Sequence, residues 1–61
     1  MRKWLKDLRK GAGFTIKGFA AHVGISATYY DKIERGERNV SVKVAKLIAP
    51  ALGFEWQRFF E

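Results

Sequence analysis

The apolar residues of this chain recur at helical spacing within short segments that glycines separate. In the first segment, MRKWLKDLRK, the side chains of Trp4, Leu5 and Leu8 fall on one stripe, with five basic residues around them. The sequence GAG breaks this segment, and further glycines stand at positions 24, 36 and 53. The pattern therefore predicts a succession of short helices, of which the first covers residues 1–10.

A second and a third helix are predicted on either side of Gly24. Thr15 is a candidate N-cap for the segment IKGFAAHV, because its hydroxyl can accept a hydrogen bond from the first turn. Gly24 stands where a C′ glycine ends a helix, so the chain should turn sharply there. Ser26 is the candidate N-cap of the third helix, ATYYDKIER, which should end at Gly36.

The C-terminal third predicts a fourth helix and a last short helix or turn, EWQRFF. Ser41 is the candidate N-cap of VKVAKLIAPAL, whose inward positions are expected to be Val44, Leu47, Ile48 and Ala51. Pro50 cannot donate to the carbonyl of Lys46, which predicts a kink or an end to the helix near Ala49. Alternating valines at positions 40, 42 and 44 leave a short strand as a minor alternative.

The third predicted helix has two distinct faces. Tyr30 and Ile33 are three residues apart and share the inward face, so the Tyr30 hydroxyl should reach the edge of the core. Tyr29 lies on the flank, where core packing and contact with a backbone phosphate or sugar both remain open. The opposite, outward arc consists of Ala27, Thr28, Asp31, Lys32 and Arg35.

The composition limits the size of the fold and indicates a partner. The 61 residues suit one domain over residues 1–61, and the absence of cysteine rules out a disulfide or a thiolate metal site. The net charge is +6, and residues 1–46 hold eleven Lys or Arg against four Asp or Glu. Residues 47–61 carry a balance of −1. A basic body of this kind predicts a polyanionic partner, and the alternative is that the charge serves solubility alone.

Several classes of function find no support in the sequence. The longest uncharged apolar run, LIAPALGF, has eight residues, whereas a helix that spans a membrane needs roughly 20. No apolar stretch follows the basic N-terminus, so we expect no signal peptide. His22 is the single histidine, and no nucleophile–base pair or phosphate-binding glycine loop has usable spacing. We therefore expect no enzyme activity, no metal, no cofactor, no small-molecule ligand and no membrane partner.

The second and third predicted helices, joined by VGIS, have the anatomy of a helix-turn-helix over about residues 15–35. In that motif the second helix lies exposed for the major groove of DNA. Ile25 is suited to fill the junction between the two helices. The same spacing also occurs in helical corners that bind no DNA, so it does not establish the function alone.

A longer stretch is more specific. The sequence LRKGAGFTIKGFAAHVGISATYYDKIERGERNVS, followed by AKLIAPALG, resembles the Cro-type (XRE) family of bacterial and phage repressors. The resemblance rests on VGIS upstream of KIERG, on the serine before the fourth helix and on the ALG ending, and it covers roughly residues 4–60. It implies an all-α, compact five-helix, lambda-repressor-like fold that binds double-stranded DNA as a homodimer.

The resemblance also implies roles for individual residues. It assigns base reading to Ala27, Thr28 and Lys32, and their chemistry suits thymine methyl contact, hydrogen bonding and donation to guanine, respectively. It pairs Glu34 with Arg9 as a structural ion pair. Contacts with the DNA backbone are expected from the helix starts, the third helix and the following loop, at Thr15, Lys17, Ser26, Tyr29, Arg35, Arg38, Asn39, Ser41 and Lys43.

Three positions depart from the family pattern. Ile16 stands where the family usually has a glutamine that contacts backbone phosphate, and isoleucine forms no side-chain hydrogen bond. The family often carries proline at the position of Val40 and an ordinary helix former at the position of Pro50. The first departure weakens the expectation of ordinary operator binding, and the other two concern details of the fold.

Two functions are therefore compared. The first is a transcriptional regulator, a repressor that binds a palindromic operator as a homodimer in the cytoplasm of a bacterium or as a phage product. The second, which Ile16 and Asp31 favour, is a protein-binding module of the same fold, such as an antitoxin or adaptor. The aromatic tail and the end of the fourth helix are candidates for the dimer interface. Within that tail Trp56 and Phe59 are expected in the core, and Phe54 and Phe60 are left open.

Overall fold

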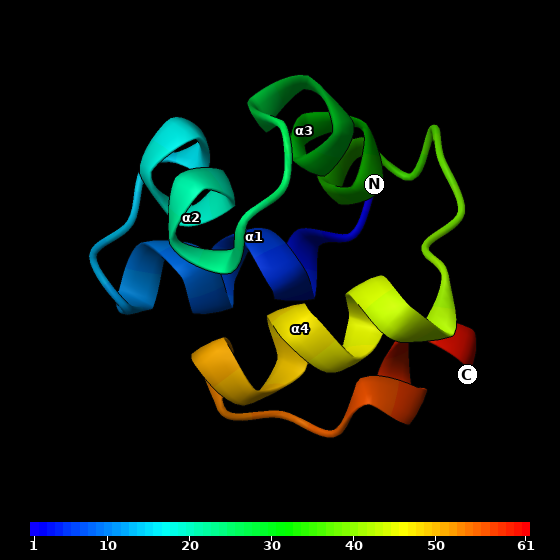
Figure 1. Ribbon diagram of the computed structural model, residues 1–61. Helices are drawn as coiled ribbons and strands as arrows, with labels where there is room; N and C mark the ends of the chain where they lie inside the picture. Colours follow the sequence, from blue (N-terminus) through cyan, green and yellow to red (C-terminus); the bar gives the residue numbers. More distant parts are fainter.

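Four α-helices and one short 3-10 helix follow one another along the chain, and no strand is present. The computed structural model describes residues 1–61 (Figure 1). Its elements are α1 (Lys3–Gly11), α2 (Ile16–Val23), α3 (Ala27–Arg35), α4 (Val42–Leu52) and the 3-10 helix η1 (Trp56–Phe60). The all-α prediction is confirmed, but the expected fifth helix is a single 3-10 segment. The strand alternative over residues 40–44 is wrong.

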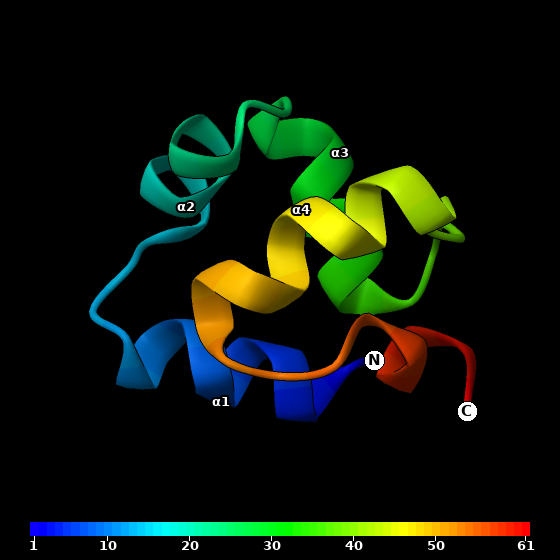
Figure 2. The same ribbon diagram turned by 60° about the horizontal axis from the view of Figure 1, so that its bottom comes forward.

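The helix-turn-helix and the C-terminal elements occupy opposite sides of the molecule. In Figures 1 and 2, α2 and α3 lie together at one end, and η1 lies against α4 at the other. The first helix, α1, packs against α3. The N-terminus comes close to the C-terminal end of α3, because the backbone amide of Arg2 donates to the carbonyl of Glu34 at 2.7 Å.

One apolar core joins all five elements. Its largest fully buried side chains are Leu5, Phe19, Tyr30, Ile33 and Ile48, which α1, α2, α3 and α4 contribute. From η1, the ring of Phe59 joins this core. In a chain this short, burial of these side chains must supply most of the stability, at about 1.5–3 kcal/mol each.

The inward face of α4 differs from the predicted one. Leu47 is 45% exposed, whereas Ala45, Ile48 and Ala49 are buried, and Val44 and Ala51 are half-buried. The buried stripe is centred one position later than predicted. Ala45 and Ala49 on this stripe let the backbone of α4 approach the core closely. Alanine is only weakly hydrophobic, so a prediction based on hydrophobicity easily misses it as a buried residue.

The helix α4 continues through Pro50 to Leu52. Of the two predicted outcomes, a kink or an end near Ala49, the end near Ala49 is therefore wrong. Only the bond to the carbonyl of Lys46 is lost, and both Pro50 and Lys46 are exposed, so water can satisfy that carbonyl. The turn closes instead at Gly53, which adopts φ of 76°, and the amides of Gly53 and Phe54 both donate to the carbonyl of Ala49. A proline in the last helical turn is therefore tolerated here.

The aromatic tail mainly completes the core of this chain. Phe54 packs edge-on against Trp4, with ring centroids 5.0 Å apart, and both rings contact Phe59. Trp56 and Phe54 are both half-buried and pack against the core, whereas Phe60 is 52% exposed. The prediction is therefore confirmed for Phe59 and met in part by Trp56, and Phe60 is the residue of the tail that is left exposed.

Candidate nucleic-acid interface

Three hydroxyl side chains fix the starts of α2, α3 and α4. Thr15 accepts a hydrogen bond from the amide of Gly18 at 3.0 Å, and Ser26 accepts one from Tyr29 at 3.0 Å. Ser41 accepts from Val44 at 3.1 Å. All three predicted N-caps are therefore confirmed. Each capping bond uses an oxygen lone pair and leaves the hydroxyl proton free to donate to a phosphate.

The turn between α2 and α3 has the geometry that its glycine indicated. Gly24 adopts φ of 83°, in the left-handed region that other residues rarely enter, and its amide donates to the carbonyl of Ala20. The amide of Ile25 donates to the same carbonyl at 3.0 Å. The half-buried Ile25 packs against the core at this junction. This paired hydrogen bonding is a Schellman-type ending, and it sets the start of α3 directly after the turn.

The outward face of α3 has the predicted composition. Thr28, Lys32 and Arg35 are exposed, and Ala27 and Asp31 are half-buried. Asp31 forms an ion pair with Arg35, at 3.2 Å between Oδ2 and Nε, while Lys32 forms none. The ion pair therefore restrains the side chain of Arg35. The positive charge of Arg35 in turn offsets that of the Asp31 carboxylate, so Asp31 is not an isolated negative charge on this face.

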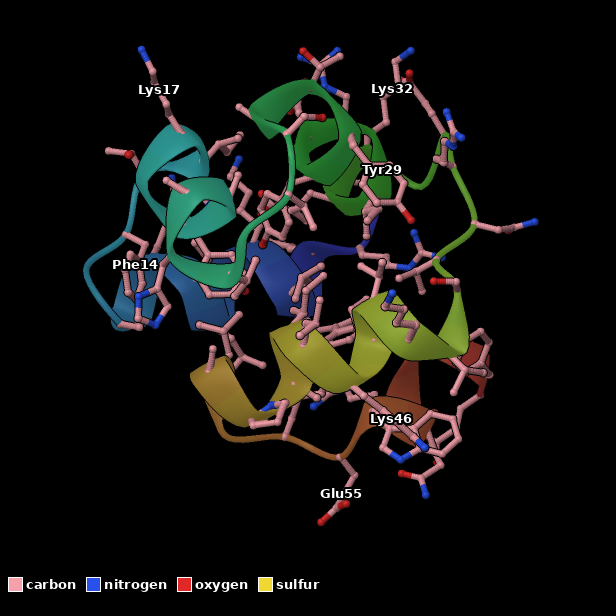
Figure 3. All side chains as sticks on the ribbon, viewed as in Figure 1. Phe14, Lys17, Tyr29, Lys32, Lys46 and Glu55 are labelled. Carbon is pink, nitrogen blue, oxygen red and sulfur yellow. The ribbon has the colours of Figure 1, made fainter.

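Basic side chains from two helices extend from the same edge of the molecule. Figure 3 shows Lys17 of α2 and Lys32 of α3 projecting in one direction, away from Lys46 and Glu55 on the C-terminal side. The basic Arg35 belongs to the same outward face of α3, whereas the half-buried Tyr29 lies on its flank. This edge is therefore the positively charged surface that a polyanion would meet.

The loop after α3 is tied down at two points. The Arg38 guanidinium lies over the Tyr29 ring, with Cζ 5.3 Å from the ring centroid. Its backbone carbonyl accepts a hydrogen bond from Nη1 of Arg2 at 3.4 Å. Arg38 and Asn39 are both exposed, as is Lys43 in the first turn of α4. Tyr29 thus packs against the core and also supports a basic side chain.

The predicted ion pair between α1 and α3 is present and buried. Arg9 donates to Glu34 through Nε at 2.8 Å and through Nη2 at 3.0 Å, and its Nη1 donates to the carbonyl of Phe14. Only 5% of Arg9 and 2% of Glu34 are exposed. Burial is the largest single influence and would raise the pKa of the Glu34 carboxyl. The hydrogen bonds from Arg9, the neighbouring Tyr30 hydroxyl and the positive charges of Arg9 and Lys6 together outweigh burial and hold that pKa below its ordinary value. The hydrogen bond to Glu34 also raises the pKa of Arg9.

Tyr30 lies deeper than expected. It is fully buried, and its hydroxyl has no hydrogen-bond partner, so the prediction that this group reaches the edge of the core is wrong. Burial raises the pKa of Tyr30, and the neighbouring carboxylate of Glu34 raises it further without meeting hydrogen-bond geometry. Tyr30 lies this deep because α1 packs against α3 at this point, where Arg9 pairs with Glu34.

Sequence reasoning missed Arg2, which closes the C-terminal end of α3. Its Nη1 donates to the carbonyl of Ile33, and its backbone amide donates to Glu34. The bond to Glu34 satisfies a carbonyl that a helix end otherwise leaves open, whereas the carbonyl of Ile33 also accepts from the amide of Gly36. The partners lie 31 and 32 residues apart in sequence, so no local pattern marked Arg2 for this role.

No arrangement for a metal or a membrane is found. No group of three or more His, Cys, Asp or Glu side chains is placed to hold a metal ion. The ring of His22 instead packs near Phe14, with ring centroids 5.2 Å apart. No helix has the length and apolar character that crossing a bilayer requires.

Comparison with known proteins agrees with this geometry. The family described as "Helix-turn-helix" matches residues 5–59. The chain is 49% identical over 61 residues to an uncharacterized HTH-type transcriptional regulator, YqaF, of Bacillus subtilis (strain 168), covering all of this chain and 80% of that protein. It is 39% identical over 57 residues to the control protein C.MunI of a Mycoplasma species, covering 92% and 77% of the two chains. No solved structure is a significant match. The chain therefore belongs to the helix-turn-helix family of DNA-binding transcription regulators, in its Cro-type (XRE) branch.

Proposed function

We propose that this protein is a repressor that binds a palindromic operator as a homodimer, with α3 in the major groove. The observation that carries the proposal is the exposed face of Thr28, Lys32 and Arg35 on the same basic edge as Lys17. The start of α3 supplies two of the proposed base-reading residues, Ala27 and Thr28, and Lys32 follows one turn later. Repression follows where the bound dimer blocks access of polymerase to a promoter in the bacterial cytoplasm.

Backbone contacts are proposed at both ends of the motif. The capping hydroxyls of Thr15, Ser26 and Ser41 each have a proton to donate to phosphate. The side chains proposed to join them are Lys17, Arg35, Arg38, Asn39 and Lys43. Tyr29 is proposed to contribute to these backbone contacts through Arg38, whose guanidinium lies over its ring. A set of this size predicts binding that weakens steeply with salt.

The homodimer is proposed to form through the C-terminal side. Val42 is 46% exposed and Phe60 is 52% exposed. On the same side, Nζ of Lys46 lies 5.1 Å from the ring centroid of Trp56, which in turn contacts Phe60. Sedimentation velocity should detect a dimer that Phe60→Ser weakens. Gln57→Ser, which changes an exposed residue of the same 3-10 helix, is the matched control and should leave the dimer intact.

The decisive experiment is selection of bound duplexes from a random pool, followed by titration of the enriched sequence over a range of salt. A two-fold dimer should enrich an inverted repeat with half-site centres about 34 Å apart. The logarithm of its affinity should fall linearly with the logarithm of salt concentration. Salt-sensitive binding without an enriched sequence would reject the operator model and favour the protein-binding alternative, an antitoxin or adaptor. The ion pair between Asp31 and Arg35 supports the operator model, because it partly offsets the negative charge of Asp31 on this face.

A further inference from the structure

A shallow hollow lies between the start of α2 and the outward face of α3. The residues that line it are Ile16, Lys17, Ala27, Thr28, Asp31 and Arg35. Ile16 and Ala27 are its two apolar members, and they are the first residues of α2 and α3. The polar members surround this pair with hydrogen-bonding and charged groups. The hollow is therefore a small apolar patch within the basic edge.

Both apolar residues are held in place from the inside. Ile16 and Ala27 are half-buried, and each packs in part against the core while another part lines the hollow. Ile16 also lines a neighbouring hollow beside the buried pair of Arg9 and Glu34, so one side of its chain is fixed by the junction of α1, α2 and α3. A side chain restrained in this way presents a defined apolar surface to a ligand.

The polar residues limit what can occupy the hollow. Thr28 is exposed and does not cap a helix, so its hydroxyl is available to donate or to accept. Arg35 forms an ion pair with Asp31, and Lys17 adds a second exposed positive charge to the lining. The occupant must therefore combine a small apolar group with an adjacent hydrogen-bonding atom, next to a polyanion.

We propose that this hollow receives the 5-methyl group of a thymine, and that Ile16 is a specificity-determining residue of this chain. The proposal rests on the proposed DNA-binding function. The thymine methyl is the only apolar group that base edges present in the major groove, and the O4 acceptor lies beside it. Ile16 and Ala27 cover the methyl group, and the Thr28 hydroxyl donates to O4.

Ile16, which stands where the family usually has glutamine, gains a physical role from this placement. A glutamine there would offer an amide to phosphate, whereas isoleucine offers only apolar contact. The change therefore replaces a contact that positions the protein on any sequence with one that distinguishes thymine from other bases. Operator binding is preserved, and its selectivity depends on a methyl group.

The test uses the duplex that selection enriches, with each thymine of one half-site replaced in turn by uracil. Uracil lacks only the 5-methyl group, so the hydrogen-bonding atoms are unchanged. At one position we expect binding to weaken about fourfold, which corresponds to one buried methyl group. In the Ile16→Ala variant, the loss of affinity caused by uracil at that position should fall to about twofold or less. The reason is that one of the two apolar residues around the methyl group has been shortened.

Two further variants keep the test informative. Ile16→Gln restores the residue that the family usually has at this position and should also lose most of the uracil effect, which covers the case in which Ile16→Ala unfolds. Arg38→Ala, outside the hollow, should weaken binding to the thymine and uracil duplexes equally.

The outcomes separate this inference from the function on which it rests. If no sequence is enriched, the operator function itself is rejected. A second outcome is that an operator is found but no uracil substitution weakens binding, or that Ile16→Ala and Ile16→Gln keep the full loss of affinity with uracil. In that case the hollow does not bind a thymine methyl group, and the operator function stands.

Discussion

The guanidinium of Arg38 lies over the ring of Tyr29, with Cζ 5.3 Å from the ring centroid. The ring is itself packed against the core, so it provides a fixed platform for a flexible side chain in the loop after α3. A cation over an aromatic face is stabilised by about 0.5–1 kcal/mol at an exposed site. Arg2 also restrains Arg38, because its Nη1 donates to the backbone carbonyl of Arg38. Arg38 is therefore held in position before any DNA is bound.

Replacing Arg38 by alanine should weaken binding to all DNA sequences by a similar factor. If this guanidinium meets a phosphate, its loss should reduce the slope of log affinity against log salt by about one unit. Fluorescence anisotropy over a range of salt, with the operator and an unrelated duplex, measures both quantities. A loss confined to the operator would show that Arg38 contacts a base instead.

Tyr29→Leu should weaken DNA binding through Arg38, because the platform under the guanidinium is removed. Tyr29→Phe keeps the ring and is the matched control, with affinity expected within about twofold of the wild type. The double-mutant cycle with Arg38→Ala identifies the route: Tyr29→Leu should have little further effect once Arg38 is gone. Additive effects would mean that Tyr29 contacts DNA independently.

Lys32→Ala should act differently, by relaxing the preference at one or two base positions. Its side chain is exposed, lacks an ion pair and projects from the outward face of α3. We expect a cost of about 1–3 kcal/mol at the affected positions, with other positions unchanged. Repeating the duplex selection with this variant gives the answer directly. Equal weakening of every sequence would contradict the proposed base-reading face.

The buried pair of Arg9 and Glu34 should dominate the response to acid and to mutation. Arg9→Met leaves a buried carboxylate without its partner, at a cost of about 3–5 kcal/mol, comparable to the whole stability of a domain this small. Circular dichroism should show this variant largely unfolded. The double variant Arg9→Met, Glu34→Leu removes both charges and should recover much of the loss.

The pH dependence of the same pair has a definite sign. The folded pKa of Glu34 lies below its unfolded value, so the carboxylate stabilises the fold above pH of about 4.3, and this contribution is lost as the pH falls. Urea unfolding from pH 7 down to pH 3 should therefore show a smaller decline in the double variant Arg9→Met, Glu34→Leu, which lacks this carboxylate, than in the wild type. An identical decline in both proteins would exclude Glu34 as the cause.

The helix boundaries were predictable because they depend on residues close in sequence. The caps at Thr15, Ser26 and Ser41 each bind an amide three residues later, and Gly24 needs only its own backbone angle. Local chemistry determines such features. The pairing of Arg9 with Glu34 came from a family resemblance, because nothing in the spacing of two residues 25 positions apart reveals it.

Features that depend on tertiary packing were missed. Leu47 was expected inside, but the close approach of Ala45 and Ala49 turns another stripe of α4 toward the core. The hydrogen bonds of Arg2 to the end of α3 connect residues at least 31 positions apart. The apolar hollow forms only when Ile16 and Ala27 meet, so the sequence marked Ile16 merely as a departure from a pattern.

Tyr30→Phe should reduce the loss of folding stability at alkaline pH without lowering the free energy of unfolding at neutral pH. The hydroxyl is buried without a hydrogen-bond partner, so its loss should leave the free energy of unfolding at pH 7 unchanged or raise it by up to about 1 kcal/mol. The folded pKa of Tyr30 is raised, so the unfolded chain releases this proton near pH of about 10 while the folded chain retains it. Stability from this group is complete below that pH and declines above it.

Urea unfolding between pH 7 and pH 11 measures this difference between the wild type and Tyr30→Phe. The wild type should lose stability more steeply above pH of about 10, because only its unfolded state gains a tyrosinate from residue 30. Tyr29→Phe retains Tyr30 and should keep the steep decline, which makes it the matched control. A loss of more than about 1 kcal/mol at pH 7 in Tyr30→Phe would instead indicate that the hydroxyl donates to Glu34 in solution.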